Sequence, residues 1–280
     1  MRVAFQGIRG AYSESALLAR FGDVEPVGFP LSEQVFDAVE SGEVDGGFVP
    51  VENSIVGPVG VNNDLLLERG VFATAESYFP IEHCLLGRIG DRLEDVKAAC
   101  SHPVALAQCR DFLDRHGVRP VLEYDTAGAA EIVARRQAPG EAAIASKRCA
   151  GIYGLAVLAE NIQSVQNNIT RFLAFRRGDG VDAPPGEKTS LAFAVHHRPG
   201  ALLDCLKRFA EHEINLTRLE SRPVPANPFE YVFFVDLLGG PGDDAVKAAL
   251  VELRAAARHL KIIGSYPVGE RPVSVRSPGR

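Results

Sequence analysis

The chain has 280 residues, of which 46% are hydrophobic and 24% charged, so it can bury one large or two ordinary cores without disulfides or metals. The formal net charge of −6 and the lack of any Lys/Arg-rich run argue against nucleic acid as a partner. Five cysteines with neither a CxxC pair nor Cys/His ligand spacing indicate free thiols in a reducing compartment and no metal site.

The first residues do not have the pattern of a targeting segment. The stretch MRVAFQGIRGAYSE lacks the long apolar region of a signal peptide, and no apolar run in the chain reaches the length that spans a bilayer. We therefore expect a cytoplasmic protein with no membrane partner.

Residues 1 to about 178 alternate between strand-type and helix-type patterns. The predicted strands are 2–6, 46–51, two runs within 71–86, 96–100, 120–124, 141–145, 157–161 and 165–175. The predicted helices begin after Gly10 and cover 32–41, 62–69, 103–115, 126–137 and 147–153. This α/β order predicts a mostly parallel sheet system in two lobes, about 1–75 plus 162–178 and about 76–161, with a small-molecule cleft between them.

Polar residues follow the first two buried strands. The sequence GIRGAYSE at 7–14 predicts a tight turn and a helix start whose backbone N–H groups could hold an anion, although a turn that needs glycine explains the same residues. Glu52, Asn53 and Ser54 follow the carboxyl end of the strand 46–51, the edge at which open α/β sheets bind ligands. An Asx-type turn that satisfies its own backbone is an equal alternative for these three.

Ser101 and Gln108 are a second candidate pair. Ser101 stands just before His102-Pro103, a good helix start, and Gln108 comes two turns later on nearly the same face, about 10 Å along the axis. A helix cap and a surface amide would account for the same two residues.

The stretch VQNNITRFLAF at 165–175 changes from polar amides to a strand pattern at Thr170, Arg171 and Phe172. Strand alternation places Thr170 and Phe172 on one face and Arg171 on the other. A hydroxyl and a guanidinium at the mouth of a buried strand could serve chemistry, but many ordinary strand starts look the same.

A second module begins after the Gly/Pro/Asp-rich linker 179–187. Residues 188–268 read as strand, helix, strand, strand, helix, strand, the order of a ferredoxin-like βαββαβ module. The tail 269–280 is predicted to be disordered. Because the strand with Thr170 ends at this linker, a shift at 176–187 is expected to pull on Thr170.

Several motifs, taken in order, resemble those of the prephenate dehydratase family. They are GxxGAYSE at 7–14, PVENSIVGPV at 50–59, SHP…ALAQC at 101–109 and NNITRF at 167–172. The second module resembles an ACT regulatory domain through PGALLDCL at 199–206 and LESRP at 219–223. The resemblance covers residues 1 to about 268 and implies a two-lobed, periplasmic-binding-protein-like (type II) catalytic domain followed by an ACT domain.

The resemblance also implies an activity and its residues. The family converts prephenate to phenylpyruvate on the way to phenylalanine, without a cofactor, because aromatisation drives the loss of water and CO₂. The implied catalytic residues are Thr170, Arg171 and Phe172, although Arg171, on the opposite strand face, could instead brace the strand. The implied substrate-binding residues are Asn53, Ser54, Ser101 and Gln108.

Regulation is implied for the ACT domain. L-Phenylalanine would bind between subunits of a homodimer or homotetramer that is joined through the ACT domains. The implied effector-binding residues are Gly200, Ala201, Leu202, Asn215, Glu220, Ser221, Arg222 and Pro223.

The sequence departs from the family pattern at a few places. Val104 stands where Gln often follows SHP, Ile8 where Pro is common, and Phe229 where Trp is often found. Chorismate mutase helices, which precede this domain in some fusions, are not expected because the first predicted strand begins at Arg2.

Two other functions stay open. One is arogenate dehydratase, whose substrate carries an amine in place of the keto group. The other is a non-catalytic, amino-acid-sensing binding protein. The neutral polar residues of the predicted cleft favour an enzyme, because a binder of a dicarboxylate would be expected to show several Arg or Lys side chains there.

Overall fold

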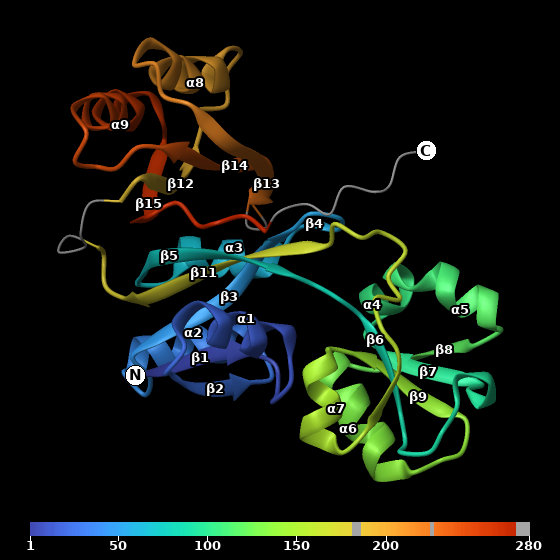
Figure 1. Cartoon of the computed structure of the whole chain (residues 1–280). Helices are drawn as coiled ribbons and strands as arrows, with labels where there is room; N and C mark the ends of the chain where they lie inside the picture. Colours follow the sequence, from blue (N-terminus) through green and yellow to red (C-terminus); the bar gives the residue numbers. More distant parts are fainter. Residues whose placement is uncertain (181–185, 225–226, 273–280) are drawn as a thin grey trace.

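The computed structural model describes residues 1–180, 186–224 and 227–272, without the side chains of 227–229. Most of the predicted linker, the predicted tail from 273 onward and the side chain of Phe229 therefore lie outside the described residues. Figure 1 shows three bodies: a blue lobe crossed by cyan and yellow strands, a green lobe, and an orange-red C-terminal module. Within the described part of the chain, no helix is long and apolar enough to cross a membrane.

The first lobe is built on a mixed sheet. Its strand order is β5 (Val71–Pro80), β11 (Ile169–Arg177), β3 (Gly46–Asn53), β1 (Arg2–Gln6) and β2 (Glu25–Phe29), and β4 (Gly57–Pro58) pairs with β3. The helices are α1 (Tyr12–Phe21), α2 (Ser32–Ser41) and α3 (Gly60–Glu68). β11 runs antiparallel between β3 and β5, so the segment with Thr170 returns to the middle of the first sheet.

β2 was not predicted from the sequence. It pairs in parallel with β1, and it ends the sheet order on that side. Pro26 lies within it, and a proline weakens a strand signal because it has no N–H to donate. An edge strand tolerates this loss, since one side of its backbone needs no sheet partner.

The second lobe has its own sheet. The strand order is β10 (Ala156–Ala159), β6 (Cys84–Gly87), β9 (Glu141–Ala145), β7 (Ala98–Ser101) and β8 (Arg119–Leu122). The helical segments are η1 (Leu93–Asp95), α4 (Pro103–Gln108), α5 (Arg110–His116), α6 (Thr126–Arg136) and α7 (Lys147–Tyr153). The helix predicted over 103–115 is thus two helices, which meet at Cys109 with φ −105° and ψ 14°.

Two chain segments cross between the lobes, one after β5 and one before β11. They are tied to each other, because Ile81 N–H donates to Asn168 O over 2.8 Å and Ile162 N–H donates to His83 O over 3.0 Å. The side chain of Gln163 accepts from His83 N–H over 2.9 Å. These bonds make the two crossings one connection, so groups on both are held in a defined relation.

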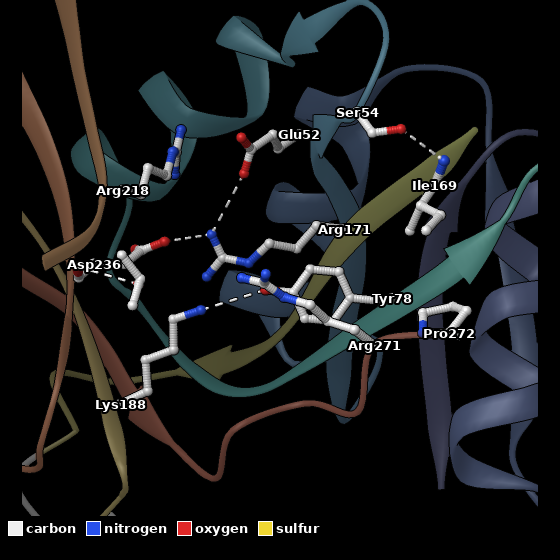
Figure 2. Close-up of a pocket in the computed structure, with 11 residues that line it drawn as sticks. Glu52, Ser54, Tyr78, Ile169, Arg171, Lys188, Arg218, Asp236, Arg271 and Pro272 are labelled. Carbon is white, nitrogen blue, oxygen red and sulfur yellow. Dashed lines mark hydrogen bonds and ion pairs between the residues drawn. The ribbon is translucent and has the colours of Figure 1, made fainter. Parts of the chain in front are cut away.

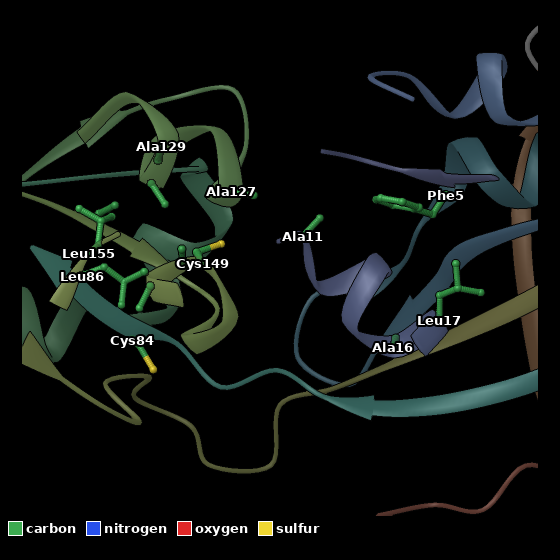
Figure 3. Packing of buried hydrophobic residues seen from close by; sticks show 14 of the residues in the cluster. Phe5, Ala11, Ala16, Leu17, Cys84, Leu86, Ala127, Ala129, Cys149 and Leu155 are labelled. Atoms are coloured by element: carbon green, nitrogen blue, oxygen red, sulfur yellow. The ribbon is translucent and has the colours of Figure 1, made fainter. Parts of the chain in front are cut away.

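The lobes also touch at the turn after β1. The apolar cluster in Figure 3 draws on both lobes, from Phe5 and Leu17 in one and Leu86 and Cys149 in the other. Gly10 lies at this contact with φ 95°, and a Cβ there would come within 2.7 Å of Cys149 Sγ. Glycine is required by backbone conformation and by space, so the predicted turn is also a lobe contact.

The C-terminal module confirms the βαββαβ prediction. Its strands are ordered β13 (Leu216–Val224), β14 (Asn227–Leu238), β12 (Lys188–Ala194) and β15 (His259–Tyr266), with α8 (Ala201–Glu211) and α9 (Asp244–Ala256) packed on them. β15 pairs in parallel with β5 through Gly264 and Ala73. The sheet of the module therefore continues the sheet of the first lobe, which the linker pattern did not indicate.

Candidate active site

A cavity of about 440 Å³ lies between the two lobes. Four predicted site residues line it: Asn53, Gln108, Thr170 and Phe172. They come from the end of β3, the end of α4 and the start of β11, segments that only the folded chain brings together.

Thr170 presents a hydroxyl whose proton is free for a ligand. Thr170 pairs with Asn53 across β11 and β3, and Asn53 Nδ2 donates to Thr170 Oγ1 over 2.9 Å. The oxygen of the Asn53 amide is identified by its partners, because Oδ1 accepts from the backbone N–H groups of Ile55 and Val56, each over 3.0 Å. Backbone N–H groups only donate, so Nδ2 must be the atom that faces Thr170. Thr170 Oγ1 therefore accepts this bond, and its own proton can point into the cavity.

This geometry bears on the two alternatives for residues 52–54. Asn53 does close an Asx-type turn on Ile55 and Val56, and it also lines the cavity. One side chain meets both descriptions, so the alternatives do not exclude each other.

The amide chain continues from Asn53 toward the crossing segments. Asn53 Nδ2 also donates to Asn168 Oδ1 over 2.8 Å, and Asn168 Nδ2 donates to Gln108 Oε1 over 3.0 Å. His83 Nε2 lies 2.8 Å from the same Gln108 oxygen, and Tyr12 Oη lies 2.8 Å from His83 Nδ1. Burial lowers the pKa of His83, an effect that its hydrogen bond to Gln108 partly offsets, and burial raises the pKa of Tyr12 well above its ordinary value.

Two predicted substrate-binding residues do not line this cavity. Ser101 is fully buried, and its hydroxyl donates to the carbonyl of Ile144 in the neighbouring strand β9 over 2.6 Å. Ser54 Oγ donates to Asn167 O over 2.8 Å and accepts from Ile169 N–H over 2.9 Å. Each hydroxyl satisfies backbone groups next to the site, so both serve the framework on which Asn53, Gln108 and Thr170 are held.

Arg171 points away from the cavity, on the opposite face of β11, as strand alternation predicts. Its side chain is 3% exposed and reaches the interface with the C-terminal module (Figure 2). Nε donates to Glu76 over 2.8 Å, Nη1 donates to Asp236, and Nη2 donates to Tyr266 Oη over 2.9 Å. With its donors used in this way Arg171 does not contact the cavity, which supports the bracing alternative, and its assignment as a catalytic residue stays a prediction.

The charges around Arg171 are closely balanced. Glu76 also accepts from Lys188 Nζ over 2.8 Å and from Gly269 N–H over 2.9 Å. Burial alone would raise the pKa of Asp236, but the Arg171 guanidinium holds it below its ordinary value. The pKa of Arg171 is in turn raised well above its ordinary value, because Tyr266 and the two carboxylates outweigh its burial. We call Arg171, Glu76, Lys188 and Asp236 the interdomain charge cluster.

Phe172 forms part of the cavity wall. Its ring is 1% exposed and stacks on Phe48, with ring centroids 4.9 Å apart and an angle of 4° between the planes. This placement gives Phe172 a packing function beside Thr170, since a phenyl ring has no group that can transfer a proton.

The cavity surface is mostly apolar with a few polar groups, and among the described residues that line it there is no Lys or Arg. His102 lines it and accepts from Val104 N–H through Nδ1 over 3.2 Å, which leaves Nε2–H as a donor. The first turns of α1 and α6 also line it through Tyr12, Ser13 and Thr126, and helix N-termini favour anions. An acidic ligand would therefore be held by neutral donors and helix ends.

Several lining residues were not predicted. Asp125 lines the cavity while its Oδ1 caps α6 by accepting from Gly128 N–H over 2.6 Å. His83 and Tyr12 also line it; Tyr12 stands in the motif at 7–14 but was not singled out, and the surroundings of His83 gave no signal because its partners lie far along the chain. In the described ranges, no group of three or more His, Cys, Asp and Glu side chains could hold a metal ion.

The predicted effector residues fall into two groups. Gly200, Ala201 and Leu202 line a cavity of about 380 Å³ at the start of α8. The others lie elsewhere: Glu220, Ser221, Arg222 and Pro223 are on β13, which ends the sheet order, and Asn215 is the residue just before that strand. Arg222 contacts the first lobe, where its Nε donates to Asp64 over 2.8 Å.

Comparisons with known proteins agree with this architecture. Residues 3–179 match the family described as Prephenate dehydratase, and residues 189–255 match the ACT domain. The protein named arogenate dehydratase/prephenate dehydratase 1, chloroplastic, of Arabidopsis thaliana is 40% identical over 285 residues, which cover 96% of this chain and 72% of that protein.

Two solved structures are also similar. The prephenate dehydratase of Arthrobacter aurescens in complex with L-Phe has a TM-score of 0.88 and 31% identity, over 99% of this chain and 94% of that one. A structure described as GqqA, a novel type of quorum quenching acylases, has a TM-score of 0.88 and 36% identity, over 95% of this chain and 98% of that one.

Proposed function

The chain belongs to the prephenate dehydratase family, whose members are lyases, and from this premise we propose that it converts prephenate to phenylpyruvate in the interlobe cavity. The observation that carries the proposal is the orientation of Thr170, which accepts from Asn53 and keeps its own proton for a ligand. A leaving hydroxyl needs such a donor, because it departs more readily as it gains a proton.

The proposed reaction needs little else from the protein. The bond between the ring and its carboxylate breaks, its electron pair enters the ring, and the C–O bond to the ring hydroxyl breaks. CO₂ and, after uptake of one proton, water leave. A threonine hydroxyl is a weak acid, so Thr170 orients and partly protonates the leaving oxygen, and the net proton comes from solvent. The lack of Lys and Arg among the described lining residues suits this reaction, since a cation beside the ring carboxylate would stabilise the charge that must leave.

Arogenate is the alternative substrate, and one observation favours it. Asp125 lines the cavity, and only its Oδ1 caps α6, so the carboxylate could also pair with the ammonium group that arogenate carries. The Arabidopsis relative is named for both substrates.

We expect the purified chain to release phenylpyruvate from prephenate with a higher kcat/KM than it shows for arogenate dehydration. Asp125→Asn keeps a helix-capping oxygen and removes the charge, so it is expected to lower activity on arogenate alone. Spectroscopic assays of both substrates with both proteins measure this.

The same preparation is tested for acylase activity, and hydrolysis of an acyl amide without turnover of prephenate or arogenate would overturn the proposed function.

We further propose that L-phenylalanine regulates the enzyme through its ACT domain, in a homodimer or homotetramer. The cavity at Gly200–Leu202 and the phenylalanine complex of the Arthrobacter protein support this. The predicted effector residues on β13 do not line that cavity, which is the arrangement expected if a second subunit supplies them. Phenylalanine is expected to stabilise the assembly and to lower turnover.

Two physical routes connect the ACT domain to Thr170. One is the linker 179–187. The other is the interdomain charge cluster, in which Arg171, the neighbour of Thr170 on β11, donates to Asp236 on β14. The second route is the shorter one along the chain, because no residue separates Arg171 from Thr170.

We expect Asp236→Asn to reduce the response of the rate to saturating phenylalanine several-fold, while the rate without phenylalanine stays close to that of the wild type. Insertion of flexible residues after Gly180 is expected to leave the response intact. Rate against phenylalanine concentration is measured for both, together with the Tm shift that reports binding. Undiminished control in Asp236→Asn, combined with lost control in the insertion variant, would assign the coupling to the linker.

A further inference from the structure

The buried His83 and the half-buried Tyr12 form a pair that the proposed reaction does not use. His83 is 2% exposed and lies on the first crossing segment between the lobes, just before β6. Tyr12 is the first residue of α1 in the other lobe. Both line the cavity, and their hydrogen bond spans the hinge side of the cleft.

The direction of every hydrogen bond between Asn53 and His83 can be deduced. The backbone N–H groups of Ile55 and Val56 identify Asn53 Oδ1, so Asn53 donates and Asn168 Oδ1 must accept. The other end of Asn168 is then its Nδ2, which can only donate, and so Gln108 Oε1 must accept. His83 Nε2 faces that same oxygen and must carry the proton.

The far end of the chain is consistent with this direction. Burial disfavours the charged imidazolium, so a neutral ring with its proton on Nε2 leaves Nδ1 as an acceptor. Tyr12 Oη lies 2.8 Å from Nδ1 and 2.9 Å from the backbone carbonyl oxygen of Glu82, so its single proton is shared between these two acceptors. The tautomer is therefore set by Gln108, and Tyr12 accommodates it.

These bonds determine which end of the Gln108 amide is left for a ligand. Its Oε1 accepts from two donors, Asn168 and His83, and no described residue is a partner of its Nε2. Since Gln108 lines the cavity, its –NH₂ group is the end left for a ligand.

We infer that His83 is a positioning residue that turns the carbonyl of Gln108 into the protein and its –NH₂ toward the substrate, so that this wall of the cleft recognises an oxygen acceptor. The inference rests on the proposed function for its substrate: a carboxylate or keto oxygen of prephenate provides such an acceptor. The hydrogen-bond chain itself does not depend on the reaction.

A matched pair of variants tests the inference. His83→Gln is long enough to keep an N–H donor within reach of Gln108 Oε1. His83→Asn is shorter, keeps a partner for Tyr12 and leaves Gln108 without that donor. We expect His83→Asn to lose about tenfold in kcat/KM for prephenate, the value of roughly one hydrogen bond, and His83→Gln to stay within about threefold of the wild type.

A merely structural role would lower activity equally in both variants. Equal losses, no loss in either variant, or a larger loss in His83→Gln would overturn the inference.

A second measurement needs neither substrate nor variant: ¹⁵N NMR of the imidazole in the wild-type protein is expected to show a neutral ring protonated at Nε2. A ring protonated at Nδ1 alone would overturn the inference, while wild-type inactivity on prephenate and arogenate would count only against the proposed function.

Discussion

Replacing Thr170 by valine is expected to lower kcat/KM for prephenate by roughly 10²–10⁴-fold, the usual contribution of a positioned proton donor. Valine keeps the branched shape at Cβ and removes the hydroxyl that accepts from Asn53 Nδ2 and faces the cavity. Asn53 retains its bond to Asn168, so the rest of the amide chain stays in place.

Thr170→Ser is the matched control, because it keeps the hydroxyl and loses a methyl group. It is expected to retain most of the activity. Steady-state kinetics of both variants are compared with their free energies of unfolding, and the valine variant is expected to lose only about 1 kcal/mol of stability, as for one hydrogen bond. Near-normal turnover in Thr170→Val would remove Thr170 from the mechanism.

Replacing Arg171 by methionine is expected to destabilise the protein by about 3–5 kcal/mol, the usual cost of leaving buried charges without their partner. Glu76 and Asp236 are 1% exposed and would lose the guanidinium that lies between them. Lys188 remains beside Glu76, so Asp236 is the group left with less compensation.

Arg110→Met is the control, because Arg110 pairs with Asp114 at the surface with side chains 69% and 61% exposed. Such a pair contributes at most about 1 kcal/mol. Unfolding in urea measures both variants. An Arg171→Met loss as small as that of the control would mean that the interdomain charge cluster does not hold the module to the first lobe.

The same variant should change the acid sensitivity of the protein. Arg171 holds the pKa of Asp236 below its ordinary value, so the native state gains stability above that ordinary value and loses it as the pH falls through the lowered one. Without Arg171 the pKa of Asp236 loses the largest of the effects that lower it, so this contribution shrinks. The acid-induced fall in the free energy of unfolding should therefore be smaller in Arg171→Met than in the wild type.

Apolar residues that recur at every second position, as in strands, or at every third to fourth position, as in helices, predicted much of the architecture. They indicated an α/β catalytic part, a βαββαβ module after it, and the opposite facing of Thr170 and Arg171. The strand β2 was not predicted because Pro26 obscures its pattern. The helix over 103–115 was predicted to be continuous because Cys109 fits an apolar stripe whether or not the helix is interrupted there.

Hydroxyl side chains were the least predictable candidates. Ser54 and Ser101 stand in motifs beside the site, yet each is used by a backbone group across the sheet or loop. A serine near a ligand and a serine that bonds a neighbouring carbonyl have the same local sequence, so only the fold distinguishes them.

The sequence by itself determined the order of modules, the family and the short segments that carry Asn53, Gln108 and Thr170, because these depend on local periodicity and on motifs. The tertiary structure decided what each polar group does. The proton of Thr170 is free because backbone N–H groups at 55 and 56 orient Asn53, and the same orientation passes through Asn168 and Gln108 to His83. The bracing position of Arg171 is evident only from its partner on the ACT domain, Asp236. Which group donates and which accepts in these bonds depends on residues far apart in the chain. It is decided only once folding has brought donor and acceptor together.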